Sequence, residues 1–284
     1  MKSNYSKLKG IGILATILLL FASCQKKFNP DSYAPVQSFG GFGSSNQIQP
    51  SNLVGHWAFE NSLVDSVSAT VATGVNTTFS TGIKGAGLQG ADKAYVTSTP
   101  SNAILSLQSF TVSLWVNVPQ NTKGTYGLVN LSNTADFWGN FDIFFENGST
   151  SSNGVFKYHV ENWKTAATDN ETWSDNLSVG DVWNKWIHFA VTYNAASSTF
   201  VVYQNGTAIN TKVNAGNGTL KFQNASALIF GTMQFNVTPS LGTAGGPQDW
   251  ASYVPGKMDE IRIYKAALSA DEVKALYQLE KLGK

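Results

Sequence analysis

A strict alternation of apolar and polar residues across positions 110–118 limits what this chain can fold into more than any other feature. The apolar members are Phe110, Val112, Leu114, Val116 and Val118, and the residues between them are Thr111, Ser113, Trp115 and Asn117. A period of two places successive side chains on opposite faces of a strand, so this segment predicts a strand with one face in a core. Residues 186–193 are apolar or semi-apolar on both sides, which is typical of a central strand.

Turn and cap signals extend this pattern to the rest of the chain. Asn205-Gly206 separates apolar runs at 199–204 and 207–210 and predicts a hairpin with a two-residue type I′ turn. Shorter strands are expected at 53–59, 94–97, 126–131, 141–146, 155–160, 227–231 and 257–264. Only the C-terminal end departs from this pattern, because Ser269 and Glu272 have the spacing of a capping box and precede apolar residues at helical spacing. We therefore expect an all-β antiparallel sandwich with a short C-terminal helix.

Composition agrees with a sandwich and excludes some partners. Charged residues make up 13% of the chain, against about 25% in a typical soluble domain. The 26 glycines suit a chain that turns often between short strands. The formal net charge is +1 and Arg262 is the only arginine, so the bidentate contacts that mark nucleic-acid binders are almost lacking. We expect no nucleic-acid partner.

The N-terminus has the pattern of an export signal. Lys2, Lys7 and Lys9 precede an apolar run at 11–22, which is too short to span a hydrocarbon core of about 30 Å but fits a signal peptide. Residues 20–24 (LFASC) resemble the lipobox of bacterial lipoproteins, whose cysteine is lipidated and becomes the mature N-terminus. We expect a lipoprotein signal peptide at 1–23 and a lipid anchor at Cys24. The alternative is an ordinary secretory peptide with an incidental cysteine.

The segment after Cys24 predicts a tether. Residues 25–51 contain three prolines and no hydrophobic period, which indicates a flexible linker. We therefore divide the chain into a signal peptide at 1–23, the lipidated cysteine and tether at 24–51, and one folded domain at 52–284. The expected location is the bacterial cell envelope, anchored by lipid to the outer membrane and either periplasmic or surface-exposed.

Several segments of the folded part carry a family resemblance. They are 55–59 (GHWAF), 85–88 (GAGL) leading to 94–96 (AYV), 109–116 (SFTVSLWV), 186–193 (WIHFAVTY), 202–206 (VYQNG), and 256–264 (GKMDEIRIY) followed by 267–269 (ALS). In this order they resemble the laminin-G-like jelly-roll domains of the concanavalin A-like lectin and glucanase superfamily. The resemblance implies two antiparallel sheets, one of them concave. It does not select a function, because this fold hosts lectins, adhesion modules, glucanases and structural domains.

Catalysis is not expected from the acidic residues. The glucanases of this superfamily carry an E-x-D-x-x-E run on one strand, and this chain has none. Asp142 and Glu146 share a strand side but are four residues apart, about 13 Å, whereas retaining glycosidases need about 5 to 5.5 Å. Asp259 and Glu260 point to opposite faces. The histidines at 56, 159 and 188 have no triad or metalloprotease spacing, so glycoside hydrolysis is the less favoured alternative.

Loop tryptophans and nearby polar residues favour sugar binding. Flat aromatic faces bury the C–H face of a pyranose, while amides and carboxylates bind its hydroxyls. The candidate glycan-binding residues are Trp138, Asn140, Asn162, Trp163, Asp169, Trp173 and Trp250. Trp57, Trp115 and Trp186 fall on expected strands and are interpreted as packing residues, while Trp183 stays ambiguous. The alternative for the loop tryptophans is that they cap the ends of the sandwich.

The resemblance also raises the question of calcium. Acids recur in this family at the positions of Asp65 and Asp259, which are therefore candidate Ca²⁺ ligands. The small glycine-containing turn usual after the first acid is replaced by Val67-Ser68-Ala69. A solvated or hairpin-capping aspartate is the alternative, and no cofactor is required by the sequence.

These features predict a non-catalytic envelope lipoprotein whose jelly-roll domain binds oligo- or polysaccharides or mediates adhesion. Its resemblance to surface lipoproteins of polysaccharide-harvesting bacteria suggests capture of oligosaccharides near an uptake system. The alternative is a structural or protein-binding scaffold component of an envelope complex. Exposed loop tryptophans would favour the glycan-binding function, and buried loop tryptophans would favour the scaffold function.

Overall fold

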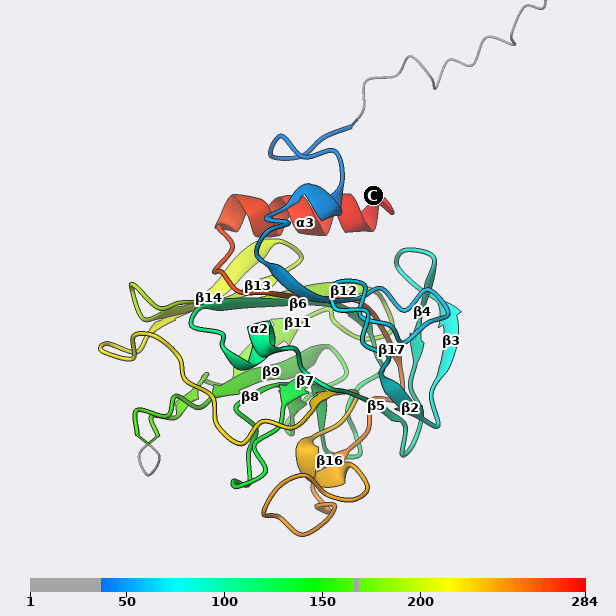
Figure 1. The fold of residues 1–284 in the computed structure, drawn as a ribbon. Helices are drawn as coiled ribbons and strands as arrows, with labels where there is room; N and C mark the ends of the chain where they lie inside the picture. Colours follow the sequence, from blue (N-terminus) through cyan, green and yellow to red (C-terminus); the bar gives the residue numbers. More distant parts are fainter. Residues whose placement is uncertain (1–36, 166–168) are drawn as a thin grey trace, which may run out of the picture. The chain divides into compact units, whose positions relative to one another are not determined.

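A computed structural model describes residues 37–165 and 169–284, and residues 38–284 form one compact unit. The expected signal peptide, Cys24 and the first part of the expected tether, up to residue 36, lie outside the described residues. Among the described helices, none combines the length and apolar character that crossing a membrane requires. Two sheets make up the unit and are stacked as layers (Figure 1).

The first sheet has eight strands, and its order is β14-β13-β12-β6-β17-β4-β3 with β1 paired to β17. Their bounds are β1 (Leu53–Trp57), β3 (Thr78–Thr81), β4 (Ala86–Gln89), β6 (Phe110–Asn117), β12 (Ile187–Asn194), β13 (Thr199–Gln204), β14 (Thr207–Val213) and β17 (Lys257–Tyr264). All of these pairs are antiparallel. The expected hairpin between β13 and β14 is confirmed, because Asn205 and Gly206 both have positive φ, of 50° and 74°.

The second sheet has nine strands, and its order is β10-β9-β8-β7-β15-β5-β2, with β11 paired to β9 and β16 paired to β7. Their bounds are β2 (Thr73–Val75), β5 (Tyr95–Ser98), β7 (Thr125–Leu131), β8 (Phe141–Glu146), β9 (Asn153–Val160), β10 (Thr172–Trp173), β11 (Leu177–Gly180), β15 (Leu228–Phe230) and β16 (Ala251–Ser252). Its pairs are antiparallel except for β16 with β7. The antiparallel two-sheet jelly-roll sandwich expected from the sequence is confirmed.

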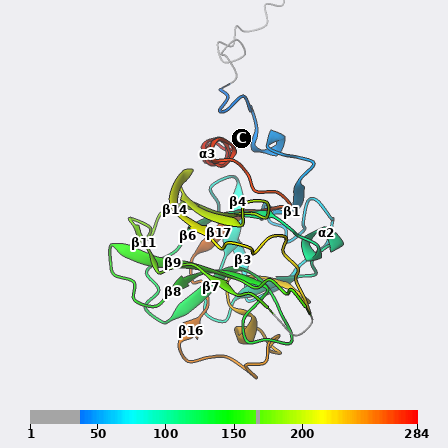
Figure 2. The same ribbon diagram turned by 90° about the vertical axis from the view of Figure 1, so that its left-hand side faces the viewer.

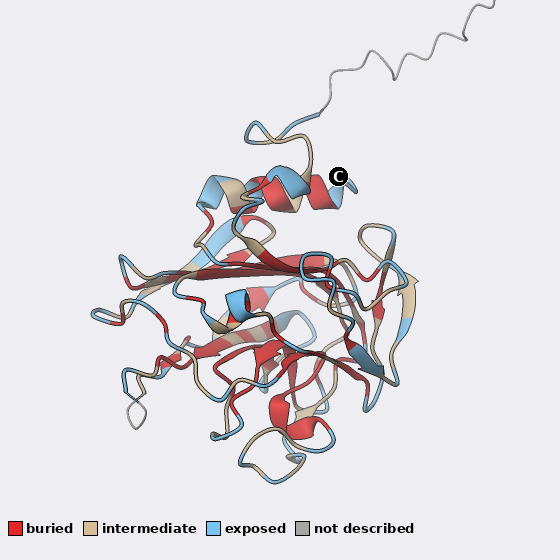
Figure 3. Cartoon of the chain, viewed as in Figure 1, coloured by how far each residue is buried: buried red, intermediate tan, exposed pale blue. Residues whose placement is uncertain are grey.

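The core lies between the two sheets. Phe110, Val112, Leu114 and Val116 of β6 all belong to it, as their alternation predicts. Opposing layers meet through aromatic rings, as where Phe156 of β9 stacks on Phe189 of β12 with 4.5 Å between centroids. Buried residues follow the strands of both sheets, while exposed ones gather in the connecting loops (Figure 3).

Helix α3 (Ala270–Lys281) covers the outer face of the eight-stranded sheet (Figures 1 and 2). The expected capping box is present, with Ser269 and Glu272 bonding each other's backbone N–H groups. Trp115 lies on the face of β6 that alternates with the core residues, and it is also buried because α3 covers this face. Its Nε1 donates to Glu280 Oε2 of α3 at 2.8 Å. The remaining described helical segments are short: α2 (Asn102–Leu105), η2 (Ser45–Gln47) and η3 (Gln234–Asn236).

The expected tether at 24–51 is too long, because part of it belongs to the folded unit. Ser45 and Ile48 are 0% and 1% exposed. Arg262 reaches out of the sheet and donates to Ser45 Oγ at 3.2 Å and to Asn46 Oδ1 at 3.1 Å. Because polar bonds to a buried guanidinium order this segment, a search for hydrophobic periodicity does not detect it.

Candidate functional site

The outer face of the nine-stranded sheet carries an aromatic surface that we call the tryptophan face, formed by Trp138, Trp173 and Trp250. Trp138 lies in the loop between β7 and β8, Trp173 in β10, and Trp250 just before β16. Trp138 meets Trp173 with 4.9 Å between ring centroids and Trp250 with 5.9 Å. Buried Phe144 and Phe235 support these rings from the sheet and from η3. Three loop tryptophans predicted from separate segments therefore meet on one face.

Alternation along β8 and β9 explains why polar groups share this face. In β8, Phe141, Ile143 and Phe145 enter the core, so Asp142 and Phe144 face outward. In β9, Phe156, Tyr158 and Val160 enter the core, so Lys157 and His159 face outward. The register pairs Asp142 with His159 and Phe144 with Lys157, which places a buried carboxylate beside a buried imidazole.

His159 sits at the centre of the polar part of the site. Its Nδ1 lies 3.0 Å from Asp142 Oδ2, and its Nε2 lies 3.5 Å from Glu171 Oε1. Its ring lies under Trp173, with 4.2 Å between centroids. Burial lowers the pKa of His159, but the hydrogen bond with Asp142 and the ion-pair contact with Glu171 outweigh burial and raise the pKa to about 9. In the free protein this imidazole therefore carries a proton at neutral pH.

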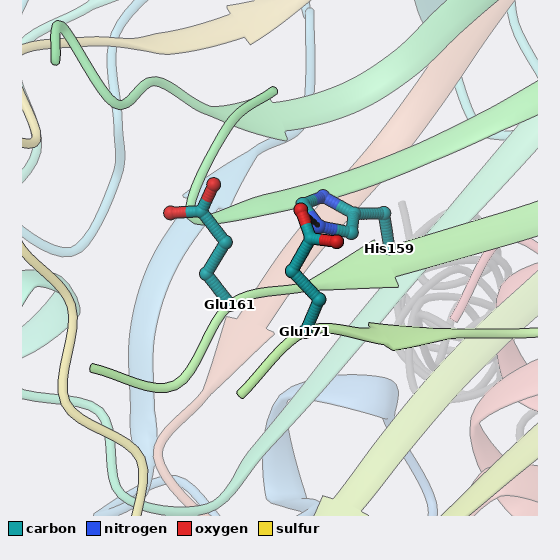
Figure 4. Close-up of side chains that lie close together, drawn as sticks. All are labelled: His159, Glu161 and Glu171. Atoms are coloured by element: carbon teal, nitrogen blue, oxygen red, sulfur yellow. Dashed lines mark ion pairs between the residues drawn. The ribbon is translucent and has the colours of Figure 1, made fainter. Parts of the chain in front are cut away.

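Two glutamates with opposite pKa shifts flank His159. Glu161 is buried, and its Oε2 accepts bonds from Asn133 Nδ2 at 2.7 Å and Trp163 Nε1 at 2.8 Å. Burial raises the pKa of Glu161 to about 7, against the lowering effect of these two bonds. Glu171 has a side chain 41% exposed, and its bond with His159 lowers its pKa. Figure 4 shows the side chains of Glu161, Glu171 and His159 close together. One ligating atom of each lies within 4.8 Å of the others.

The carboxylates of this face are arranged differently from what the sequence suggests. Asp142 is engaged by His159, and Glu146 pairs with Lys157 at 3.5 Å between Oε2 and Nζ. Glu161 and Glu171 each have a carboxylate oxygen within 4.8 Å of the other's, as do Asp136, Glu161 and Asp169 among themselves. Glu161 is fully buried, and its Oε2 accepts hydrogen bonds from two side chains.

Two of the expected sugar ligands, Asn140 and Asn162, have their amides bound by other parts of the protein. Asn140 is 0% exposed; its amide donates to Ser132 O and Gln223 O and accepts from Gln223 N–H. Asn162 is 0% exposed and bridges in the same way to Asn217, Thr219 and Lys221. Both amides satisfy backbone groups of neighbouring loops, so neither is presented to a ligand.

The other expected residues lie at or near the tryptophan face. Trp163 is half-buried and holds Glu161 through its Nε1. Asp169 brings its carboxylate near those of Asp136 and Glu161, with one oxygen of each within 4.8 Å of the others. Trp250 is 37% exposed. Of the remaining tryptophans, Trp57 and Trp115 are buried as expected, while Trp183 and Trp186 are half-buried and outside the face.

The two calcium candidates face hydrogen-bond donors. Asp65 accepts from the N–H groups of His56, Val67 and Ser68 and thereby caps a turn. Asp259 accepts from the N–H groups of Ile83, Lys84 and Glu260. A carboxylate surrounded by N–H donors is already compensated, so both match the hairpin-capping alternative better than a cation site.

His159, Glu161 and Glu171 were not among the expected site residues. The sequence offers one signal for them, because His159 and Glu161 alternate along the end of β9 and so leave the core on the same side. Glu171 is ten positions beyond Glu161, and only the fold brings it back over β9 through the pairing of β10.

Fold and site together define an antiparallel jelly-roll domain with an aromatic face on one sheet. A sequence profile described as the concanavalin A-like lectin/glucanases superfamily matches residues 89–274. The chain belongs to this superfamily. No curated protein sequence matches it significantly.

Solved structures with the same fold include binding domains of toxins and a domain of a glycoside hydrolase. The binding domain of Paraclostridial Mosquitocidal Protein 1 is 18% identical with a TM-score of 0.58, over 80% of this chain and 52% of that one. A second match is domain 4 of AbnA, a GH43 extracellular arabinanase from Geobacillus stearothermophilus, in complex with arabinotriose. It is 19% identical with a TM-score of 0.55, and the match covers 80% of this chain and 98% of that domain. A third match is the botulinum neurotoxin serotype D ligand binding domain in complex with N-acetylneuraminic acid. It is 15% identical with a TM-score of 0.57, and the match covers 82% of this chain and 52% of that one. The chain spans about half the length of the toxin domains, and identities this low show the fold alone.

Proposed function

We propose that this domain binds a carbohydrate at the tryptophan face. The observation that carries the proposal is the meeting of Trp138, Trp173 and Trp250, from three separate segments, on the outer face of one sheet. The C–H face of a sugar ring is apolar and is buried well against an indole. Partial exposure of these rings favours a binding surface over a packed cap, since Trp250 is 37% exposed and the other two are half-buried.

Polar groups beside the rings would meet the sugar hydroxyls. Glu171 presents a partly exposed carboxylate next to Trp173, whose Nε1 donates to Glu171 Oε2 at 3.2 Å. Lys157 lies over the Trp173 ring, with its Nζ 5.2 Å from the centroid. An apolar platform flanked by a few placed polar groups is the usual composition of a small-ligand site.

The structural neighbours support this proposal. Two of them are described in complex with sugars, one with arabinotriose and one with N-acetylneuraminic acid. We propose for this chain binding without hydrolysis, because Glu161, whose pKa is raised to about 7 by burial, is enclosed by the protein and not exposed to a substrate. With the expected anchor at Cys24, the domain would present glycans at the bacterial envelope near an uptake system.

Tryptophan fluorescence tests the proposal directly. A soluble form starting at Gln25 is titrated with a panel of polysaccharides and oligosaccharides, and a saturable change is expected with one of them. Trp173→Ala should shift the titration to about tenfold or higher sugar concentration, whereas Trp186→Ala, which removes a half-buried tryptophan elsewhere, should leave it unchanged. If a well-folded protein responds to no glycan at millimolar sugar, the proposal fails. Pull-down of envelope proteins would then test the scaffold alternative.

A further inference from the structure

We propose that His159, Glu161 and Glu171 form a binding site for a divalent transition-metal ion, with Zn²⁺ as the best fit. The three residues come from the end of β9 and from the segment that leads into β10 (Figure 4). This inference goes beyond sugar binding, because it concerns polar atoms beside the tryptophan face, although Glu171 belongs to both proposals.

The spacing of the atoms fits one ion. One ligating atom of each residue lies within 4.8 Å of the others, and His159 Nε2 is 3.5 Å from Glu171 Oε1. Zinc bonds to nitrogen and oxygen are about 2.0 to 2.2 Å, so two ligands of a tetrahedral ion lie about 3.4 Å apart. The His159–Glu171 pair already has this separation. Glu161 needs only a side-chain adjustment to complete three ligands.

Two buried atoms at this point lack a hydrogen-bond partner. Within the described residues, His159 Nε2 and Glu161 Oε1 accept or donate no hydrogen bond, and both residues are 0% exposed. Buried polar groups are nearly always satisfied, so two unsatisfied atoms of ligand type on residues of one cluster require an explanation. A bound cation satisfies both at once.

The other atoms of the three ligands are held from outside. Asp142 Oδ2 lies 3.0 Å from His159 Nδ1, Asn133 and Trp163 donate to Glu161 Oε2, and Trp173 donates to Glu171 Oε2. In metal sites, a ligating histidine almost always gives its second nitrogen to a carboxylate or carbonyl, which fixes its orientation. Each residue is therefore fixed through one of its two polar atoms, which leaves the other atom for an ion. Asp142 acts as a positioning residue for His159.

The donor set selects the class of ion. One imidazole with two carboxylates suits Zn²⁺ and its neighbours, whereas Ca²⁺ takes six to eight oxygen ligands. Charge favours a dication as well, because Asp142, Glu161 and Glu171 surround a single histidine. The Glu171 side chain is 41% exposed, so one of the three ligands is in contact with solvent. The oxygen-only group of Asp136, Glu161 and Asp169 is a competing location that shares Glu161.

Calorimetry with Zn²⁺ tests the site. Full-length protein in detergent, carrying no histidine tag and dialysed against EDTA and then buffer, should bind one Zn²⁺ and should bind Ca²⁺ far more weakly. Glu171→Gln, a change at a partly exposed side chain, should lower the Zn²⁺ affinity at least about tenfold, as should His159→Gln. Asp142→Asn should lower it by about 10- to 100-fold. Glu146→Gln on the same sheet face is the matched control and should bind as the parent does.

Further outcomes decide the location and guard against misfolding. The melting temperature of each ion-free variant shows whether it is folded. If His159→Gln does not fold, Glu171→Gln still tests the site. Co²⁺ should give the visible absorption of a tetrahedral nitrogen and oxygen site in the parent and lose it in Glu171→Gln. Failure of the parent to bind Zn²⁺, or equal binding by parent and Glu171→Gln, would overturn the proposal. Loss of binding in Asp136→Asn with retention in His159→Gln would move the ion to the oxygen-only group and overturn it too.

Discussion

Trp138 and Trp173 meet edge to face, with 4.9 Å between their ring centroids and an interplanar angle of 83°. One ring comes from the loop before β8 and the other from β10, which is paired to β9. The pairing of β8, β9 and β10 therefore fixes the relative position of two side chains 35 positions apart in the sequence. A rigid pair of this kind can bind a flat ligand without first being ordered.

Helix α3 is held to the sheet by a buried ion pair that can be broken selectively. Arg262 Nε donates to Glu280 Oε1 at 2.7 Å, and both side chains are 0% exposed. Glu280→Gln should lower the free energy of unfolding by about 3 kcal/mol, because it leaves the guanidinium with less compensating charge. Urea unfolding measures the change. Lys274→Gln, an exposed change in the same helix, should cost little, and a comparable loss in both variants would contradict this account.

The Asn205-Gly206 turn lies against α3, so a methyl group there should be costly. Gly206 has a φ of 74°, and an added Cβ would lie 3.0 Å from Lys274 Cα. Gly216 has a φ of 79° with nothing within 4 Å of an added Cβ. Gly216→Ala should lower the free energy of unfolding by about 1 kcal/mol through the left-handed backbone alone. Gly206→Ala should lower it further, because the added methyl group also meets the helix. Equal losses in chemical denaturation would show that the contact with the helix adds nothing.

His188 should make stability depend on pH. It is fully buried, and burial lowers its pKa to about 3, while in the unfolded chain it titrates near 6.5. As the pH is lowered, the unfolded state therefore binds the proton first. The free energy of unfolding keeps its full value above about pH 6.5 and decreases by about 1.4 kcal/mol per pH unit as the pH falls toward the folded pKa. Between pH 7 and 5 this amounts to about 2 kcal/mol. Unfolding free energies of the parent and His188→Gln, measured across this range, should differ in slope; identical slopes would contradict the prediction.

Local patterns predicted the sandwich well because they report how a strand meets a core. The alternation at 110–118 corresponds to β6, and the capping box at Ser269 begins α3. The packing of Ser45 under Arg262 left no such pattern, because it depends on polar bonds between segments more than 200 positions apart. The same reason applies to Asn140 and Asn162, whose amides look like sugar ligands in the sequence but are used by distant backbone groups.

The site was only partly predictable for a related reason. The loop tryptophans were found because aromatic residues in loops are conspicuous in any sequence. The cluster of His159, Glu161 and Glu171 depends on how β10 folds back along β9 and on the loop that carries Asn133, and neither relation follows from spacing along the chain.

The central claim is that the tryptophan face binds a glycan, and calorimetry on two tryptophan variants tests it most directly. The parent, Trp173→Ala and Trp186→Ala are titrated with the oligosaccharide that gives the strongest fluorescence response, after equal melting temperatures have been verified. The account predicts that Trp173→Ala weakens binding by about tenfold or more through loss of the stacking surface, while Trp186→Ala binds as the parent does. Equal affinities for all three proteins would show that the sugar binds elsewhere and would contradict the account.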